Sequence, residues 1–309
     1  MNLREPFGTA SRIGLVGLGS MGAGIARNLL QKGYRLHVYA RRPEIAATFA
    51  KAGAGVASSP AMLGRECDLV FLSVSDAAAV NEVLFGDQGL AQALQAGSCV
   101  VDTSTIAASS AREIGAKLQH SGIAFLDAPV SGGQAGAEAG TLGCMVGGSA
   151  DAVAACRDVM ASFCKAITHV GDLGAGQTVK ACNQVAVAGA MLGVADAIAL
   201  ARAQGVDPAL MRDVLLGGTA RSVPLERMAP RIIEGDFKPG FRARLMRKDL
   251  RIALDTARTN GAQLPCAELA EQLVDALCKG GRADWDWCAV ALEVQKRSGL
   301  GIPDAPQRA

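Results

Sequence analysis

The chain has 309 residues, half of them hydrophobic, which suits one large or two ordinary domains with substantial buried cores. Its formal net charge is only +2 and it has no long basic run, so the composition gives no support for nucleic-acid binding. Nine cysteines are scattered without a C-x-x-C pair, so we expect free thiols and a cytoplasmic, reducing location.

Neither a leader nor a membrane span is expected. The first twelve residues have no apolar core segment, unlike a signal peptide. The longest apolar run, residues 185–201, is interrupted by Asp196. We therefore expect a buried helix at a domain or subunit junction and no membrane association.

The first part of the chain alternates two kinds of segment. Short β-branched runs predict strands at 13–17, 36–39, 68–74, 99–102, 123–126, 143–146 and 167–170. Helical spacing predicts helices at 21–32, 43–52, 77–84, 107–119 and 151–163. This alternation indicates an α/β domain over 11–172 with a mostly parallel, doubly wound sheet.

A glycine-rich turn joins the first predicted strand to the first predicted helix. Its G-x-G-x-x-G pattern follows an apolar strand and precedes an amphipathic helix. Gly17 would permit the tight turn, Gly19 the approach of a pyrophosphate, and Gly22 close packing of the helix. The pattern predicts a Rossmann-type dinucleotide-binding domain, with cofactor contacts at Gly17, Leu18, Gly19, Ser20, Met21 and Gly22.

The end of the second predicted strand favours NADP over NAD. NAD-binding domains usually carry an acidic residue there, about 20 residues past the glycines, to bind the ribose 2′-hydroxyl. Here the strand ends in Ala40-Arg41-Arg42, without an acid. Arg41 and Arg42 have the charge and the geometry to hold a 2′-phosphate, although two solvated arginines before a helix would look the same.

Strand signals stop near residue 174, and helical segments follow. We expect helices at 176–204, 208–216, 225–234, 244–259, 267–279 and 284–297. The first is about 29 residues long, or roughly 43 Å, which is enough to link two domains. The sequence thus predicts an all-α C-terminal domain over 173–300 that serves substrate binding and dimerisation.

One lysine stands out at the start of the first of these helices. Lys180, Asn183 and Gln184 are spaced i, i+3 and i+4, so they point the same way from the helix. Their neighbours are mainly Ala, Val, Gly, Met and Leu, and desolvation lowers the pKa of a lysine toward the range useful for proton transfer. A lone lysine at a helix start is more often a surface residue, but the other motifs favour a catalytic one.

Four motifs in a fixed order carry a family resemblance. They are G-L-G-S-M-G from Gly17, D-A-P-V-S-G-G from Asp127, G-A-G-Q-T-V-K-A-C-N-Q from Gly174, and F-K-P-G-F-R with K-D-L from Phe237. Over nearly the whole chain they closely resemble the β-hydroxyacid dehydrogenase family, related to 3-hydroxyisobutyrate dehydrogenase. Within it, the N-Q pair after the lysine and the later G-A-Q-L-P most resemble the tartronate semialdehyde (2-hydroxy-3-oxopropionate) reductases.

The resemblance assigns roles position by position. It implies that Lys180 is the catalytic acid/base and that Asn183 is a substrate-orienting amide. It implies that Ser131, Gly132 and Gly133 form a loop that binds the substrate carboxylate, and an S-G-G turn has the hydroxyl and open amides of an anion nest. Lys248 is implied beside both nicotinamide and substrate, and Val74 and Thr105 along the cofactor.

The expected activity is therefore interconversion of a small β-hydroxyacid and its semialdehyde by an NADP-dependent oxidoreductase, with tartronate semialdehyde and D-glycerate as the first choice. A related substrate is the alternative: 3-hydroxyisobutyrate, succinic semialdehyde, glyoxylate or a sulfonated aldehyde. A catalytically silent NADP-binding homologue would have no chemical reason to retain Lys180, Asn183 and the S-G-G turn, and imine reductases generally lack the lysine. The three histidines are far apart, so no metal is expected, and the long apolar helix suggests a homodimer or homotetramer.

Overall fold

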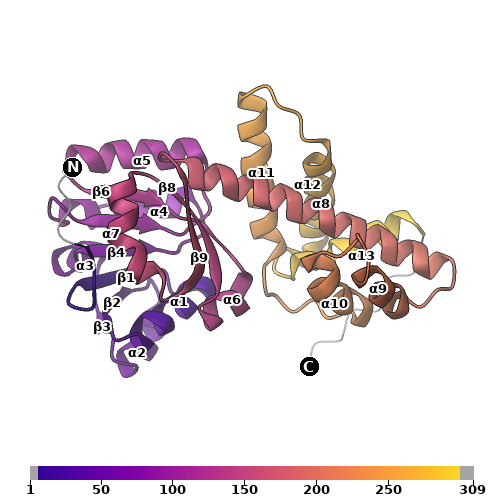
Figure 1. Cartoon of the computed structure of the whole chain (residues 1–309), viewed down its shortest axis with the longest axis horizontal. Helices are drawn as coiled ribbons and strands as arrows, with labels where there is room; N and C mark the ends of the chain where they lie inside the picture. The colour runs from indigo at the N-terminus through magenta and orange to yellow at the C-terminus, as the bar shows by residue number, and fades with distance from the viewer. Residues whose placement is uncertain (1–5, 300–309) are drawn as a thin grey trace. The chain divides into compact units, whose positions relative to one another are not determined.

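The computed structural model describes residues 6–299 and divides the chain into two compact units after Lys180 (Figure 1). The domain boundary predicted from the sequence, between 172 and 173, lies earlier, where the last strand ends and the long helix begins. The division by contacts falls later because the first turn of the long helix is hydrogen bonded to strand residues of the first unit. The predicted end of the second domain, residue 300, lies outside the described residues.

Within residues 6–299, nine strands form one sheet in the first unit. Its order is β3-β2-β1-β4-β5-β6-β8-β7, with β9 paired to β8, and the run from β3 to β6 is parallel. The strands are β1 (Arg12–Val16), β2 (Arg35–Tyr39), β3 (Gly55–Val56), β4 (Leu69–Leu72), β5 (Cys99–Asp102), β6 (Ala124–Asp127), β7 (Val130–Ser131), β8 (Leu142–Gly147) and β9 (Cys164–Gly171). The strand order reverses between β1 and β4, where doubly wound sheets bind ligands at the carboxyl ends of their strands.

Helices cover both faces of this sheet because its strands are apolar on both sides. One buried cluster joins α1 (Ser20–Gln31), α2 (Pro43–Lys51), α6 (Gly133–Ala139) and α7 (Ala150–Met160) to one face. The other cluster joins α3 (Pro60–Glu66), α4 (Ala77–Phe85) and α5 (Ala108–His120) to the opposite face. The predicted Rossmann-type α/β fold is thereby confirmed.

Four short elements were not predicted: β3, β7, α3 and α6. The α3 segment holds only seven residues, too few for a clear helical periodicity. Its start is marked by Pro60 and by the N-cap residue Ser59, whose hydroxyl accepts the Met62 N–H at 3.2 Å. The α6 segment, G-Q-A-G-A-E-A, has the composition of a loop. It is helical because it packs on α1, where Asn28 Nδ2 donates to the Ala137 carbonyl at 2.8 Å.

The second unit is helical, as predicted. Its helices are α8 (Ala175–Ala203), whose first turns belong to the first unit, α9 (Pro208–Leu216), α10 (Ala229–Glu234), α11 (Ala243–Thr259), α12 (Pro265–Leu277) and α13 (Val290–Arg297). A single apolar core made of α8, α10, α11, α12 and α13 holds them together. By length and composition α8 could cross a membrane, but half of its apolar window is buried inside the protein, as in the core helix of a globular domain.

Two of the predicted C-terminal helices are wrong in detail. A π-helical turn, Pro224–Met228, precedes α10, where one continuous helix over 225–234 was expected. The helix predicted from 284 begins only at Val290, after a 3₁₀ turn at Trp287–Ala289. The delay follows from Asp286, whose buried carboxylate accepts the backbone N–H groups of Gly240, Phe241 and Cys288 at 2.9–3.0 Å.

Candidate active site

The turn after β1 places its three glycines in different surroundings. Gly17 has a φ of +94°, and a β-carbon there would collide with the Ser73 carbonyl. A β-carbon on Gly22 would collide with the Gly17 carbonyl, so α1 starts directly against the turn. Gly19 is exposed, and nothing lies within 4 Å of an added β-carbon. The turn is therefore closed by Gly17 and Gly22 and open at Gly19.

The start of α1 offers unneutralised N–H groups at this opening. Gly19 is the N-cap residue, and within the described chain no side chain caps the helix and no acidic residue lies in its first turn. Ser20 and Met21 begin the helix, while Leu18 is buried beneath the turn. A helix start of this kind favours a phosphate, so the loop fits the pyrophosphate of a dinucleotide.

The carboxyl end of β2 carries two exposed arginines. Tyr39 ends the strand, and Arg41 and Arg42 follow before α2, with Arg42 in extended conformation as the N-cap residue. Both guanidinium groups are accessible at the edge of the sheet next to the glycine turn, because β2 lies beside β1. This placement fits the contact with a 2′-phosphate that the sequence predicts, and the contact itself stays a prediction.

The carboxyl ends of β4 and β5 are tied to each other. The Val74 N–H donates to Ser104 Oγ at 2.9 Å, and the Thr103 hydroxyl donates to the Leu72 carbonyl at 2.7 Å. Buried Asp102 accepts the Ser104 N–H at 2.9 Å. The segment that carries Thr105 is thus held against the strand end that carries Val74, on the edge where the glycine turn lies.

Asp127, at the end of β6, holds the beginning of α8. Its carboxylate oxygens accept the N–H groups of Gly174 and Gln177 at 2.7 and 2.8 Å. Burial raises the pKa of Asp127 above its ordinary value, and these two N–H groups and the charge of Arg112 oppose that rise. A β-carbon on Gly176 would lie 2.5 Å from the Met145 carbonyl, so α8 starts in close contact with the sheet.

Lys180 lies one turn beyond this anchor. Its side chain is only 7% exposed, which is unusual for a lysine. Gln177, three residues earlier, is 2% exposed and is hydrogen bonded to the backbone on both sides of Thr105. Lys180 is therefore buried one helical turn past a firmly held residue and does not lie on a solvated helix surface.

The predicted carboxylate loop at Ser131–Gly133 is shorter than expected. Ser131 ends β7, Gly133 begins α6, and only Gly132 lies between them, with a φ of +136°. The half-exposed Ser131 and the exposed Gly132 and Gly133 form an open backbone corner. Its role as a carboxylate site stays a prediction.

In the second unit, two amides and a carboxylate form a hydrogen-bonded row. Asn183 Nδ2 donates to Gln184 Oε1 at 2.9 Å, and Gln184 Nε2 donates to Asp249 Oδ2 at 2.7 Å. A carboxylate only accepts, so Asp249 fixes which end of each amide faces which way. The other Asp249 oxygen pairs with Lys248 Nζ at 3.1 Å. Asn183 is half-exposed, whereas Gln184 is buried on the side of α8 that Lys180 occupies, as the i, i+4 spacing predicts.

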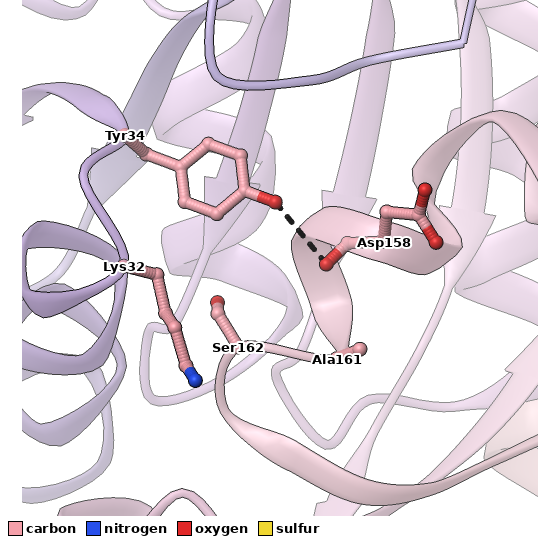
Figure 2. A pocket seen from close by; sticks show the side chains of 5 residues that line it. All are labelled: Lys32, Tyr34, Asp158, Ala161 and Ser162. Atoms are coloured by element: carbon pink, nitrogen blue, oxygen red, sulfur yellow. Dashed lines mark hydrogen bonds between the residues drawn. The ribbon is translucent and has the colours of Figure 1, made fainter.

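The described residues contain no group of three or more metal-ligating side chains. A cavity of about 250 Å³ in the first unit is lined by Lys32, Tyr34, Asp158, Ala161 and Ser162 (Figure 2). The Tyr34 hydroxyl donates to the Asp158 carbonyl there at 3.2 Å. The cavity lies beyond the end of α1, and this helix runs away from the glycine turn, so the cavity belongs to the opposite edge of the sheet.

The sequence did not single out Asp127, Gln177 or Asp249 as site residues. Asp127 and Asp249 lie inside the family motifs, but their spacing carries no sign of which groups they bind. The partners of Gln177 are 71 and 73 residues away. The need to pair the Gln177 amide follows only once the structure shows that the residue is buried, because an unpaired buried amide is costly.

Comparisons with known proteins match both units of the chain. Residues 12–171 match the model of the NAD-binding domain of 6-phosphogluconate dehydrogenase, and residues 174–293 match the NAD-binding model of NADP-dependent 3-hydroxyisobutyrate dehydrogenase. The chain is 37% identical to L-threonate dehydrogenase from Cupriavidus necator, over 90% of this chain and 94% of that protein. It is 36% identical to 2-hydroxy-3-oxopropionate reductase from Escherichia coli, over 92% and 97%.

A solved structure shows the same fold over both units. Mycobacterium tuberculosis 3-hydroxyisobutyrate dehydrogenase with L-serine matches with a TM-score of 0.84 and 32% identity, covering 92% of this chain and 99% of that one. The α/β unit and the helical unit thus recur in the same order in proteins that span the same length. The chain belongs to the 3-hydroxyisobutyrate dehydrogenase-like family of NAD(P)-dependent dehydrogenases.

Proposed function

We propose that this chain interconverts a small β-hydroxyacid and its semialdehyde with NADP(H), and that its preferred pair is D-glycerate and tartronate semialdehyde. The observation that carries the proposal is the buried Lys180, held one helical turn past the anchor of α8 at the carboxyl edge of a dinucleotide-binding sheet. An ammonium group that is positioned and shielded from water is suited to proton transfer.

The chain's own residues divide the work of the reaction. In the reductive direction, the Ser131 hydroxyl and the N–H groups of Gly132 and Gly133 bind the substrate carboxylate. Lys180 donates its Nζ proton to the carbonyl oxygen as negative charge develops there, and Asn183 orients the reacting groups. A nicotinamide cofactor, held by the glycine turn, would supply the hydride that the carbonyl carbon accepts. In the oxidative direction Lys180 takes the hydroxyl proton back. A positioned proton donor contributes about 10²–10⁴ in rate.

The choice of tartronate semialdehyde rests on the relatives and on one pair of residues. The named relatives act on L-threonate and on 2-hydroxy-3-oxopropionate, and the solved structure contains L-serine. All three are small carboxylates with a hydroxyl or carbonyl group. The Asn183-Gln184 pair supports the 2-hydroxy-3-oxopropionate assignment among them, through its resemblance to the reductases of that semialdehyde. A related semialdehyde is the alternative, and the following assay separates them.

The substrate is tested with a panel assayed with NADPH and with NADH. The panel is tartronate semialdehyde, methylmalonate semialdehyde, succinic semialdehyde, glyoxylate and a sulfonated aldehyde, with L-threonate, L-serine and 3-hydroxyisobutyrate in the oxidative direction. We expect the highest kcat/KM for tartronate semialdehyde. A higher value for another member reassigns the substrate. Absence of turnover across the panel, with NADPH binding retained, would instead favour a silent cofactor-binding homologue.

The role of Lys180 is tested by Lys180→Met, which keeps the length of the side chain and removes the proton donor. We expect kcat to fall about 10³-fold while the dissociation constant of NADPH changes little. Lys165→Met is the matched control, because Lys165 is exposed on β9. Turnover within a few-fold of wild type in the Lys180 variant would remove Lys180 from the reaction.

NADP preference is tested by replacing Arg41 and Arg42 together with alanine. Charge-assisted hydrogen bonds contribute about 1.5–3 kcal/mol each, so we expect kcat/KM with NADPH to fall at least 10²-fold and that with NADH to change little. Arg35→Ala is the control, because Arg35 is an exposed arginine at the other end of β2. Equal values for the two cofactors in the wild type, unchanged in the double variant, would reject the preference for NADP.

The same proposal includes a cytoplasmic enzyme that acts as a homodimer or homotetramer. All nine cysteines are free thiols, and burial raises the pKa of Cys67 to about 12. Thiols of this kind suit a reducing compartment.

Exposed apolar side chains on α8 and α9 support self-association, at Leu200, Leu210 and Val214. Light scattering of the purified protein measures the oligomeric state.

A further inference from the structure

Gln177 uses its side-chain amide and its backbone N–H to connect two segments that carry predicted site residues. Its side-chain Nε2 donates to the Ser104 carbonyl at 2.8 Å, and its Oε1 accepts the Ile106 N–H at 3.1 Å. Its own backbone N–H is taken by Asp127 at 2.8 Å. The side chain is 2% exposed, so water does not replace these bonds.

The Gln177 side chain bonds to the C=O of Ser104 and the N–H of Ile106, the two backbone groups that a neighbouring β-strand would otherwise pair with. The segment 104–106 lies past the end of β5 at Asp102, and no strand among the described residues pairs with it. A glutamine supplies one donor and one acceptor on the same planar group, which no carboxylate, ammonium or apolar side chain can do. The two bonds enclose Thr105, the residue between them, whose side chain is half-exposed at the site edge.

The helix end of this connection is equally fixed. Asp127 caps the first turn of α8, and a β-carbon on Gly176 would lie 2.6 Å from the Asp127 carbonyl. Lys180 follows Gln177 by three residues on the same helix. One side chain therefore joins the backbone around Thr105 to the turn that carries Lys180.

We propose that Gln177 is a positioning residue that sets the separation between the Thr105 segment, on which the nicotinamide is expected to rest, and the ammonium group of Lys180. This inference rests on the proposed function. It predicts that Gln177 governs the rate of hydride and proton transfer while contributing little to cofactor affinity. Misplacement of reacting groups by about 1 Å can cost 10²-fold in rate.

The first test uses Gln177→Met, which keeps the length of the side chain and removes both hydrogen bonds, with Thr178→Ala as control. Thr178 is exposed on the same turn, and its hydroxyl donates to the carbonyl of Gly174, the residue just before α8, at 3.0 Å. We expect kcat of the methionine variant to fall about 10–100-fold, with the KM for NADPH within about threefold of wild type. The deuterium isotope effect with labelled NADPH should rise as hydride transfer becomes rate-limiting. Unchanged kcat in folded protein overturns the proposal, as does a change confined to the KM for NADPH.

A second test does not depend on turnover. Amide hydrogen exchange is measured on the protein without cofactor, by mass spectrometry of peptides covering 103–107 and 175–180. We expect Gln177→Met to lose protection at Ile106, whose N–H has lost its acceptor, and to keep protection at the start of α8, which Asp127 still caps. Equal protection of 103–107 in the variant and the wild type contradicts the proposed connection, even if the panel shows that the proposed function is wrong.

Gln177→Glu gives a pH-dependent variant that decides the question if the methionine variant does not fold. In this variant an ionised carboxylate accepts from Ile106 but repels the Ser104 carbonyl, whereas a protonated carboxyl group restores both bonds. Four charged groups surround this connection. Asp127 on β6 accepts the Gln177 backbone N–H, Asp102 on β5 accepts the Ser104 N–H, the charge of Arg112 on α5 acts on Asp127, and Lys180 lies three residues further along α8. We expect the ratio of variant to wild-type kcat to rise about fivefold or more between pH 8 and pH 5.5, as the carboxyl group takes up its proton. A ratio that is constant with pH overturns the proposal. If the wild-type protein turns over no member of the substrate panel, by contrast, only the proposed function is rejected.

Discussion

Gly19 and Gly22 lie three residues apart, but a methyl group would have different effects at the two positions. Gly19 has a φ of −73° and open space around its β position, so we expect Gly19→Ala to fold with unchanged stability and to lose affinity for NADPH at least tenfold. At Gly22 the same methyl group meets the Gly17 carbonyl, so we expect a loss of about 1–3 kcal/mol in the free energy of unfolding. Urea unfolding and NADPH titration measure both quantities. Equal loss of stability in the two variants would show that the turn does not have one closed and one open position.

Asp286 shows how one residue controls acid stability. Burial by itself would raise the pKa of Asp286. The hydrogen bonds from the N–H groups of Phe241, Cys288 and Gly240 outweigh this effect and hold the pKa below its ordinary value. Because the pKa is lower in the folded state, the stabilisation is present above the unfolded pKa, about 3.9, and is lost as the pH falls further. We expect Asp286→Asn to lose about 3 kcal/mol at pH 7, since three N–H groups lose a charged acceptor and Arg231, 3.1 Å from Asp286, keeps the longer ion pair with Asp236 at 3.6 Å. We expect the variant to approach wild type below about pH 4. Asp284→Asn, at an exposed neighbour, is the control and should change stability little. A difference between the Asp286 variant and wild type that is independent of pH would contradict this account.

At the scale of elements, the contact of α1 with α6 joins the glycine turn to the Ser131–Gly133 corner. Gly24 of α1 lies against Ala137 of α6, and a β-carbon there would lie 2.6 Å from the Ala137 backbone. We expect Gly24→Ala to force the two helices apart, costing about 1–3 kcal/mol, and to raise the KM for the semialdehyde as the corner moves. Gly33→Ala would be a poor control because Gly33 has a φ of +81°; Ala23→Ser, one residue away and half-buried on α1, tests the same helix without adding a clash. A stable variant with wild-type KM would show that the corner is positioned independently of α1.

At the scale of the whole molecule, the two units have separate cores and the cofactor residues predicted from the glycine turn lie in the first. NADPH at 100 times its dissociation constant stabilises the folded state that binds it by about 2.7 kcal/mol. Both tryptophans, Trp285 and Trp287, are in the second unit, so their fluorescence follows that unit alone. We expect NADPH to raise the calorimetric transition of the first unit more than the transition seen by tryptophan fluorescence. Equal shifts of both transitions would show that the units unfold as one.

Much of the fold was predictable because it is encoded locally. Hydrophobic periodicity placed α9 correctly and the other long helices within a few residues, and β5 was placed without error. The α6 segment and the start of α13 were not predictable in this way. The first has a loop-like composition and is helical through packing on α1. The second is delayed by hydrogen bonds that Asp286 accepts from residues 45 and 46 positions earlier.

The sequence by itself determined the family, the order of an α/β and a helical unit, and the spacing that puts Lys180 and Gln184 on one side of α8. These depend on residues within one or two helical turns, or on motifs read along the chain. Only the tertiary structure decided that Lys180 is buried, that Asp127 caps its helix, and that Gln177 is bonded to the backbone around Thr105. Those features depend on groups 47 to 73 residues apart, whose meeting is fixed by the pairing and packing of the sheet and not by local preference.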